Sequence, residues 1–371
     1  MVYYSIFLAT FISLLSATVV VATGPKVTLP YATFQGVDDG NLAKFLGVPF
    51  AQPVYLLLSN KLNTNTLFRG AFLESGSPAS MKSVADCDGQ PFYDGLVDAN
   101  NCTGSQDTFA CLRRVPFDAF MATVNRTDNV FSFTSVSSEW VPRVDGEVIV
   151  ESPLLSVSQG AYSKIPIMTG DSDDEGTIFS FSNDNITTNA EFMGYIQSNC
   201  LPKSSPAQIA QISTLYPEDP AQGSLFGTAS ANAITPEFKR LAAFQGDFPF
   251  LGPRRFFLEH ASARQNMWSW LNLRGKTNPV IGAFHGSDSG IWLPANTMTT
   301  DSWLNFINTL DPNRSARGNG APAVFWPMWK TNSTQLLTFS DPVVVNITTD
   351  DFRSDAIRSI NELVFEAALQ K

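Results

Sequence analysis

The sequence predicts an α/β fold, because apolar stretches of strand length alternate with stretches of helical spacing along the chain. The clearest strands are expected at residues 68–76, 165–170 and 267–273. Helical and loop-like sequence fills residues 85–125, and helical spacing returns over residues 190–265. Since 44% of the 371 residues are hydrophobic and 29 are Phe, the chain can build a large core in one domain or two.

The two ends of the chain complete this pattern. Residues 27–31 and 34–37 are predicted to be short strands around polar turns. Residues 55–62 have the character of a helix end, and the tail from 351 to 369 is predicted to be an amphipathic helix. We find no internal repeat and no low-complexity tract.

Residues 1–22 predict an export signal. The segment is mainly apolar, and the small side chains of Val20 and Ala22 suit cleavage before Thr23. It lacks Lys and Arg near its start and is almost long enough to span a bilayer, so an uncleaved anchor stays open as an alternative. We expect a secreted protein whose residues 23–371 form a single domain, without stable membrane insertion after cleavage.

The acidic composition excludes two classes of partner. The formal net charge is −10, and no block rich in Lys or Arg interrupts the chain. Nucleic acids and anionic membranes attract proteins through basic patches, so neither is an expected partner. The charge itself indicates solubility, and it says nothing of oligomeric state.

Six Asn-x-Ser/Thr triplets agree with passage through a secretory pathway. Each triplet alone is weak evidence, because such sequences arise by chance, but the signal and the six together indicate a glycoprotein. The acceptors are Asn101, Asn125, Asn185, Asn313, Asn332 and Asn346.

Four cysteines predict disulfides in an oxidising compartment, and four allow three pairings. Cys102 and Cys111 enclose a short polar loop, which makes them a plausible local pair; Cys87 and Cys200 are the other two. No Cys-x-x-Cys or Cys/His cluster is present, and the chain holds only two histidines. A zinc site is therefore not expected.

Two residues carry the pattern of a hydrolase triad. Glu175 lies in Gly-Asp-Ser-Asp-Asp-Glu-Gly-Thr at residues 170–177, and His285 lies in Ala-Phe-His-Gly-Ser-Asp at residues 283–288. Both follow predicted strands, where α/β sheets gather their reactive groups, and an acid before a histidine suits the order Ser, acid, His. The carboxylate would orient the imidazole, and the imidazole would take a proton from a serine. Spacing alone also fits a solvated acidic loop and a structural histidine.

The serine that should precede this pair is missing, because Gly-x-Ser-x-Gly occurs nowhere in the chain. The run around Ser172 fails at its fifth position, and residues 286–290 have Asp288 at their centre. Ser75 and Ser77 follow a strand without a strand-to-helix elbow. Each of these serines is expected to be a polar turn or strand-end hydroxyl. The second histidine, His260, lies on a helical pattern and is expected to be an ordinary surface residue.

Several segments, in order along the chain, resemble the type-B carboxylesterase/lipase family, the fungal lipase and cholinesterase relatives within the α/β-hydrolases. The resemblance implies an α/β-hydrolase fold with a mostly parallel central sheet flanked by helices. It also implies Glu175 and His285 as triad members, a serine acyl-enzyme acting on a carboxylic ester or lipid, and no metal or organic cofactor. The segments are residues 33–36, 45–51, 67–78, 107–113, 174–177, 283–288 and 325–329. Some Trp and Phe residues around 248–257 and 325–329 could line an acyl pocket.

The chain departs from the family between Val54 and Tyr55. The family would place several strands, a Gly-rich oxyanion loop and the serine elbow there, which is on the order of 150 residues. This chain contains no Gly-Gly pair. Loss of central strands would leave unpaired sheet edges, and loss of nucleophile and oxyanion donors removes most of the rate. We expect an inactive product of a splicing error, a faulty gene model or a decaying gene; the alternative is a non-catalytic secreted binding protein.

Overall fold

The computed structural model describes residues 26–29, 32–35, 37–39, 42–44, 69–79, 89–137, 141–292, 297–315 and 323–370. These residues fall into two compact units, residues 1–51 and 52–371. The predicted export signal, Cys87 and the Val54–Tyr55 junction lie outside the described residues. The prediction of one domain over residues 23–371 therefore stays a prediction.

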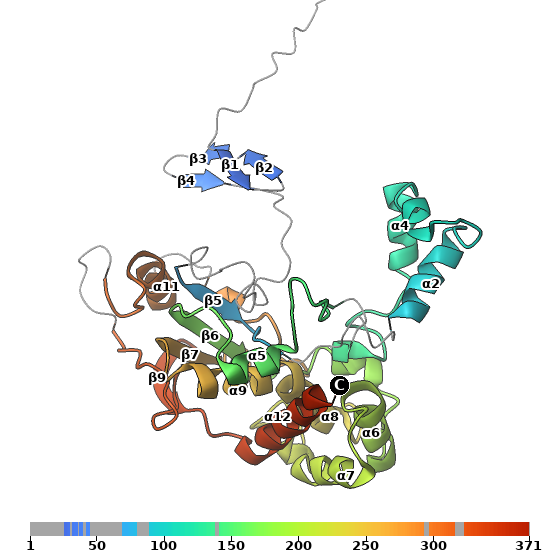
Figure 1. Ribbon diagram of the computed structural model, residues 1–371. Coiled ribbons are helices and arrows are strands. Elements are labelled where there is room, and N and C mark those ends of the chain that lie inside the picture. Colours follow the sequence, from blue (N-terminus) through green and yellow to red (C-terminus); the bar gives the residue numbers. More distant parts are fainter. Residues whose placement is uncertain are drawn as a thin grey trace, which may run out of the picture. The chain divides into compact units, whose positions relative to one another are not determined.

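The first unit contains two short antiparallel hairpins (Figure 1). In one, β1 (Lys26–Leu29) pairs with β2 (Ala32–Gln35), and in the other β3 (Val37–Asp39) pairs with β4 (Leu42–Lys44). The strands expected near residues 27–31 and 34–37 are thus present, although the second is divided between two hairpins.

The second unit is built on a five-stranded sheet, and the α/β prediction is confirmed. The strand order is β5-β6-β7-β8-β9; β5 to β8 run parallel, and β9 runs antiparallel to β8. In the part of the chain that the structure describes, no strand pairs with the outer side of β5. The strands are β5 (Ala71–Glu74), β6 (Ile167–Ser172), β7 (Met267–Asn272), β8 (Gln335–Ser340) and β9 (Val344–Thr349).

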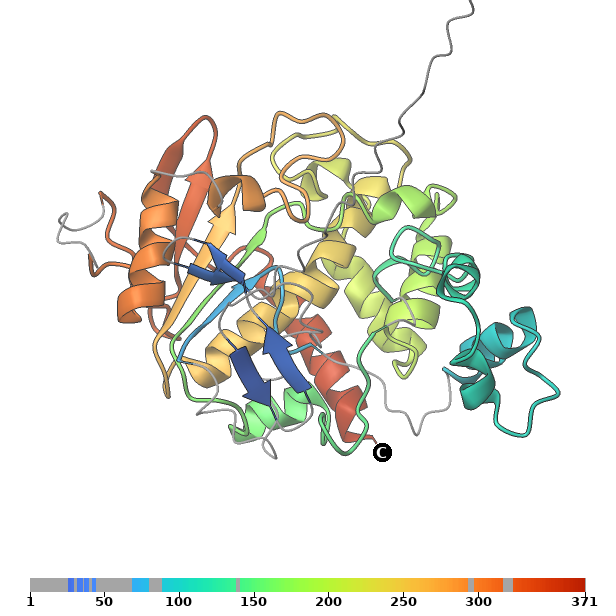
Figure 2. The same ribbon diagram turned by 90° about the horizontal axis from the view of Figure 1, so that it is seen from above.

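Helices lie in each segment between successive strands from β5 to β8, and one more follows β9 (Figure 2). Two of them, α6 and α7, begin with capping boxes in which Thr188 pairs with Glu191 and Ser205 pairs with Gln208. The helices are α2 (Gln90–Ala99), α3 (Thr108–Leu112), α4 (Phe117–Val124), α5 (Pro153–Gln159), α6 (Asn189–Tyr195), α7 (Pro206–Leu215), α8 (Phe238–Gly246), α9 (Gly252–Ala261), α10 (Ser289–Trp292), α11 (Met298–Thr309) and α12 (Ser354–Leu369).

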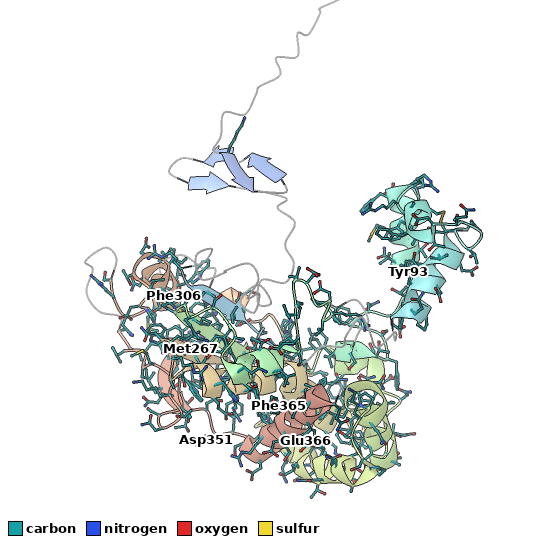
Figure 3. All side chains as sticks on the ribbon, viewed as in Figure 1. Tyr93, Met267, Phe306, Asp351, Phe365 and Glu366 are labelled. Carbon is teal, nitrogen blue, oxygen red and sulfur yellow. A yellow bond between two sulfur atoms is a disulfide. The ribbon has the colours of Figure 1, made fainter. Side chains whose placement is uncertain are left out.

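Helices cover both faces of the sheet. Side chains alternate between the two faces along each strand, so each strand contributes to the core on both sides. Ile167 and Met267 pack on one face with residues of α5, α9 and α12, among them Phe365 (Figure 3). Met168 and Trp270 pack on the other face against α10 and α11. Strands that are buried on both sides read as continuous apolar runs, which is why the sequence predicts β6 and β7 so clearly.

A buried cluster of ion pairs links the sheet to α9. Arg254 donates from Nε to Oδ2 of Asp171 at 2.6 Å and from Nη1 to Oδ2 of Asp350 at 2.7 Å, while Arg255 reaches Oδ1 of Asp350 at 2.8 Å. Burial acts to raise the pKa of Asp350, but the two guanidinium groups outweigh it and hold that pKa at about 2. The cluster joins β6, α9 and the segment after β9.

Candidate active site

The structure brings Glu175 and His285 together, although 110 positions separate them in the sequence. Nδ1 of His285 donates to Oε2 of Glu175 at 2.6 Å. The other oxygen of Glu175, Oε1, accepts from the backbone N–H of Ser172 and from Oγ of Ser75, each at 2.6 Å. The carboxylate is fully buried, and three donors fix its orientation.

The imidazole of His285 is hydrogen-bonded through Nδ1 and partly exposed to solvent. Its side chain is 35% exposed, and Nε2 has no hydrogen-bond partner among the described residues. The rings of Phe250 and Phe179 lie 4.7 Å and 5.3 Å from it, centroid to centroid. Burial acts to lower the pKa of His285, but the hydrogen bond and charge of Glu175 outweigh it, so that pKa is raised. Glu175 therefore fixes the orientation of the imidazole ring, while Nε2 is left without a partner from the described part of the chain.

A turn of π-helix presents Phe250 to the histidine. The residues Asp247–Leu251 form this turn between α8 and α9, in a long and mostly buried helical stretch. Such turns often occur at functional sites. Asp247, in the same turn, accepts from the guanidinium of Arg353 at 2.8 Å, directly before α12. That aromatic residues around 248–257 line an acyl pocket stays a prediction; Phe250 lies against the His285 ring, whereas Phe257 is buried in the core.

Asp174 holds the acid loop and the histidine loop together. Its Oδ2 accepts from the backbone N–H of Ala283 at 3.0 Å and from Nζ of Lys276 at 2.7 Å. Its Oδ1 accepts from Oγ of Ser224 at 2.8 Å. A parallel bridge also joins Asp174 to Phe284, next to the histidine. The sequence analysis quotes Asp174 only as part of a motif, because these contacts join residues about 50 to 109 positions apart.

Close backbone approach explains the glycine that follows the acid. A Cβ on Gly176 would lie 2.0 Å from the carbonyl oxygen of Ala242, so only glycine lets the acid loop pack this closely on α8. In the sequence Asp-Glu-Gly at residues 174–176, Asp174 joins the two loops, Glu175 orients His285, and Gly176 allows the close contact with α8.

No serine of the described region takes the place of the nucleophile. Ser75, which has a positive φ of 48°, donates to the acid rather than to the histidine. Ser172 and Ser287 lie 3.3 Å apart, Oγ to Oγ, and the side-chain amide of Asn272 donates to both. Ser77 is buried, and its hydroxyl has no hydrogen-bond partner in the described residues. The expectation that these hydroxyls are turn and strand-end groups agrees with the geometry.

A buried carboxyl lies three residues after the histidine. Asp288 is 1% exposed, and its Oδ2 makes no hydrogen bond within the described part of the chain. Burial and the neighbouring negative charges of Glu175, Glu74 and Asp171 raise the pKa of Asp288 to about 7. The side of the site next to the histidine is therefore acidic and poorly solvated.

The other predicted residues lie away from this site. Cys102 and Cys111 form a disulfide with sulfur atoms 2.05 Å apart, within the small cluster of α2 to α4. Cys200 is joined to no described cysteine. His260 is half-buried on α9, where Nδ1 lies 2.8 Å from the carbonyl oxygen of Phe256.

The six glycosylation acceptors are all described, and they differ in their surroundings. Asn101, Asn125, Asn185, Asn332 and Asn346 have exposed side chains. Asn313 is half-buried, and its amide forms a two-point pair with Trp326. Nδ2 donates to the Trp326 carbonyl oxygen at 2.8 Å, and Oδ1 accepts from the Trp326 N–H at 2.7 Å. An attached sugar would displace a hydrogen of this amide.

Within the described ranges, no group of three or more His, Cys, Asp or Glu side chains is arranged to hold a metal ion. No helix in those ranges is both long and apolar enough to cross a bilayer.

A mostly parallel sheet with an acid after β6 and a histidine after β7 defines an α/β-hydrolase. A solved structure has the same fold: the crystal structure of Aspergillus niger EstA aligns with a TM-score of 0.67 at 19% identity, covering 84% of this chain and 62% of that one.

The chain belongs to the carboxylesterase family, whose model matches residues 54–355. Secreted triacylglycerol lipase LIP1 of Gibberella zeae is 34% identical over 306 residues, which are 80% of this chain and 51% of that protein. Lipase 4 of Diutina rugosa is 33% identical over 279 residues, 74% of this chain and 49% of the relative. The chain thus spans about half the length of the curated relatives that it matches.

Proposed function

We propose that this chain comes from a secreted carboxylic-ester hydrolase and that, as written, it has little or no esterase activity. The observation that carries this proposal is a Glu175–His285 hydrogen bond of 2.6 Å beside an Nε2 atom with no described hydroxyl in reach. This geometry supports Glu175 as the acid and His285 as the base of a triad, while the sequence holds no Gly-x-Ser-x-Gly serine on which they would act.

The chemistry of an intact relative would use this pair in the usual way. His285 would take the proton of a serine hydroxyl through Nε2 while the serine attacked the ester carbonyl, and it would then return that proton to the leaving alcohol. Glu175 would stabilise the imidazolium. Phe250 and Phe179 supply apolar surface beside the histidine, which suits an acyl or lipid substrate, and several relatives carry the name lipase.

The missing elements would have been lost as one block at the Val54–Tyr55 junction. Support comes from coverage of about half of each relative. The family match covers residues 54–355, so the segments at 33–36 and 45–51 that resemble the family's opening lie outside it. The open outer side of β5 in the described region is where a further parallel strand would pair. A transcript that carries an intervening block with Gly-x-Ser-x-Gly would favour a faulty gene model over true decay.

Ester turnover by the purified 371-residue chain tests the proposal. We expect no hydrolysis of p-nitrophenyl butyrate above that of the His285→Ala variant, because both lack a nucleophile. Turnover by the wild type that His285→Ala abolishes would overturn the proposed inactivity. Insertion of the corresponding block of the Gibberella zeae lipase between Val54 and Tyr55 should create His285-dependent turnover, and its Ser→Ala version is the matched control.

The alternative is a non-catalytic secreted binding protein. It needs a stable fold, and its support is a sheet whose two faces both carry packed helices. Cooperative thermal unfolding without ester turnover would favour the binding protein, whereas aggregation of the purified chain would favour a damaged gene product. The secreted location rests on the apolar first 22 residues and on relatives that are named as secreted lipases.

A further inference from the structure

Strand β9 forms one edge of the sheet. It pairs antiparallel with β8 from Val344↔Ser340 to Thr349↔Gln335. On its other side no strand of the described chain is paired with it. The backbone groups on that side can therefore bond to another strand.

The sequence of β9 lacks the charged residues and prolines that usually keep an edge strand from pairing with another chain. Its sequence, Val-Val-Asn-Ile-Thr-Thr, has no charged residue, no proline and no glycine, and five of its six residues are β-branched. At the hairpin end, Val343 is 73% exposed and Val344 is 49% exposed. An uncharged, β-branched, exposed edge is a template for pairing with a second copy of the same strand.

The glycosylation triplet at Asn346 lies in the middle of this strand. Val345 and Ile347 pack against the core on the α10 and α11 face of the sheet, so Asn346 projects from the opposite face, where it is exposed. That core contains Trp268, Trp270, Trp292 and Trp326. The other five acceptors lie outside the strands, in turns, loops or helix ends. Asn346 is thus the one acceptor whose glycan would stand beside an open row of backbone groups.

We propose that an N-linked glycan on Asn346 protects β9 from pairing with a second copy of the chain. In the modification, Nδ2 of Asn346 forms a bond to the anomeric carbon of a lipid-diphosphate-linked oligosaccharide. The anomeric carbon–oxygen bond breaks, the diphosphate lipid leaves, and one amide proton is lost. A branched, hydrated glycan at the centre of a six-residue strand excludes a neighbouring strand by volume. The inference rests on the proposed passage through a secretory pathway.

Four variants distinguish the effect of the glycan on association from the effect of the strand's own sequence. Asn346→Gln removes the acceptor. Thr348→Val removes the triplet and keeps Asn346, whereas Thr348→Ser keeps the triplet and a hydroxyl that can reach Thr338, 2.6 Å away in the wild type. Asn346→Lys replaces the glycan with a charge, which protects edges by another route. Asn332→Gln is the matched control, because it removes an exposed acceptor outside the strands.

The experiment uses the full chain behind a heterologous signal in a glycosylating eukaryotic host, so secretion is independent of residues 1–22 and no ester turnover is needed. Mass spectrometry after enzymatic glycan release in ¹⁸O water reports occupancy at Asn346, and light scattering on a sizing column reports molar mass. We expect monomeric wild type, Thr348→Ser, Asn346→Lys and Asn332→Gln proteins. Asn346→Gln and Thr348→Val should shift towards a twofold or larger mass as concentration rises.

If a variant fails to fold, the folded wild type is trimmed with an endoglycosidase that leaves one sugar on Asn346, because release by amide cleavage would convert Asn346 to a charged aspartate and so protect the edge by another route. We expect the treated wild type and Asn332→Gln proteins to associate and treated Asn346→Lys to stay monomeric. The proposal is overturned if Asn346 carries no glycan. It is equally overturned if Asn346→Gln is as monomeric as Asn332→Gln, or if treated Asn346→Lys associates as strongly as the treated wild type.

Discussion

Asp288 is expected to destabilise the folded chain at neutral pH, and its replacement by Asn should reveal by how much. The carboxyl is buried without a described hydrogen-bond partner for Oδ2, in the field of three other carboxylates. Its pKa is raised from 3.8 to about 7. The folded chain therefore keeps a proton that the unfolded chain has already released between about pH 4 and pH 7.

The size of the effect follows from this rise in pKa. A rise of about three pH units, at about 1.4 kcal/mol each, corresponds to about 4 kcal/mol. Because the folded state binds the additional proton, the free energy of unfolding falls as pH rises through this window and stays low above it. The amide that Asp288→Asn introduces does not titrate. The difference between variant and wild type should thus move by about 4 kcal/mol in favour of the variant from about pH 4 to about pH 8.

Urea denaturation followed by circular dichroism at several pH values measures this difference. Comparison across pH cancels the constant cost of fitting an amide into the site. Glu218→Gln removes an exposed carboxylate and serves as the control, for which we expect a nearly constant difference. If Asp288→Asn tracks the wild type in parallel across this whole pH range, the carboxyl is solvated or paired, and the reasoning is refuted.

Three further outcomes are expected. Asn313→Asp loses the donor to the Trp326 carbonyl and should lower the free energy of unfolding by about 1–3 kcal/mol in thermal unfolding. Asn313 itself should carry no glycan when the chain is secreted, and a glycan on Asn313 in soluble protein would contradict the pairing with Trp326. Arg254→Met removes the guanidinium that pairs with the buried carboxylate of Asp171 and leaves Asp350 with Arg255 alone. It should cost about 3–5 kcal/mol in urea unfolding, so an unchanged midpoint would count against the cluster. Glu175→Gln removes the charge that opposes desolvation and should lower the pKa of His285 in an NMR titration, and an unchanged pKa would argue against the pair.

The sequence predicts those parts of the fold that depend on local periodicity. The strands at 165–170 and 267–273 are found because buried parallel strands are continuously apolar, and the structure places them at Ile167–Ser172 and Met267–Asn272. The β8–β9 hairpin is missed, although Asp341-Pro342 between an apolar stretch and a β-branched one is a turn signal that could reveal it.

The site is predictable only in its acid and its histidine, whose order and surrounding motifs are visible in the sequence. The supporting residues are not, because their roles depend on contacts between distant segments. Asp174 clamps Ala283 from 109 positions away, and Ser75 reaches Glu175 across 100 positions. The pairing of Asn313 with Trp326 likewise needs the folded chain, since its triplet looks like the other five.

The π-helical turn of Asp247–Leu251 couples the carboxyl-terminal helix mechanically to the histidine. One end of the turn is ion-paired with Arg353, where α12 begins, and Phe250 at its other end rests on the imidazole ring. Arg353 also lies 3.7 Å from Asp173, two residues before the acid. We therefore expect a displacement of α12 to shift both Phe250 and the loop that carries Glu175, and with them the surroundings of His285.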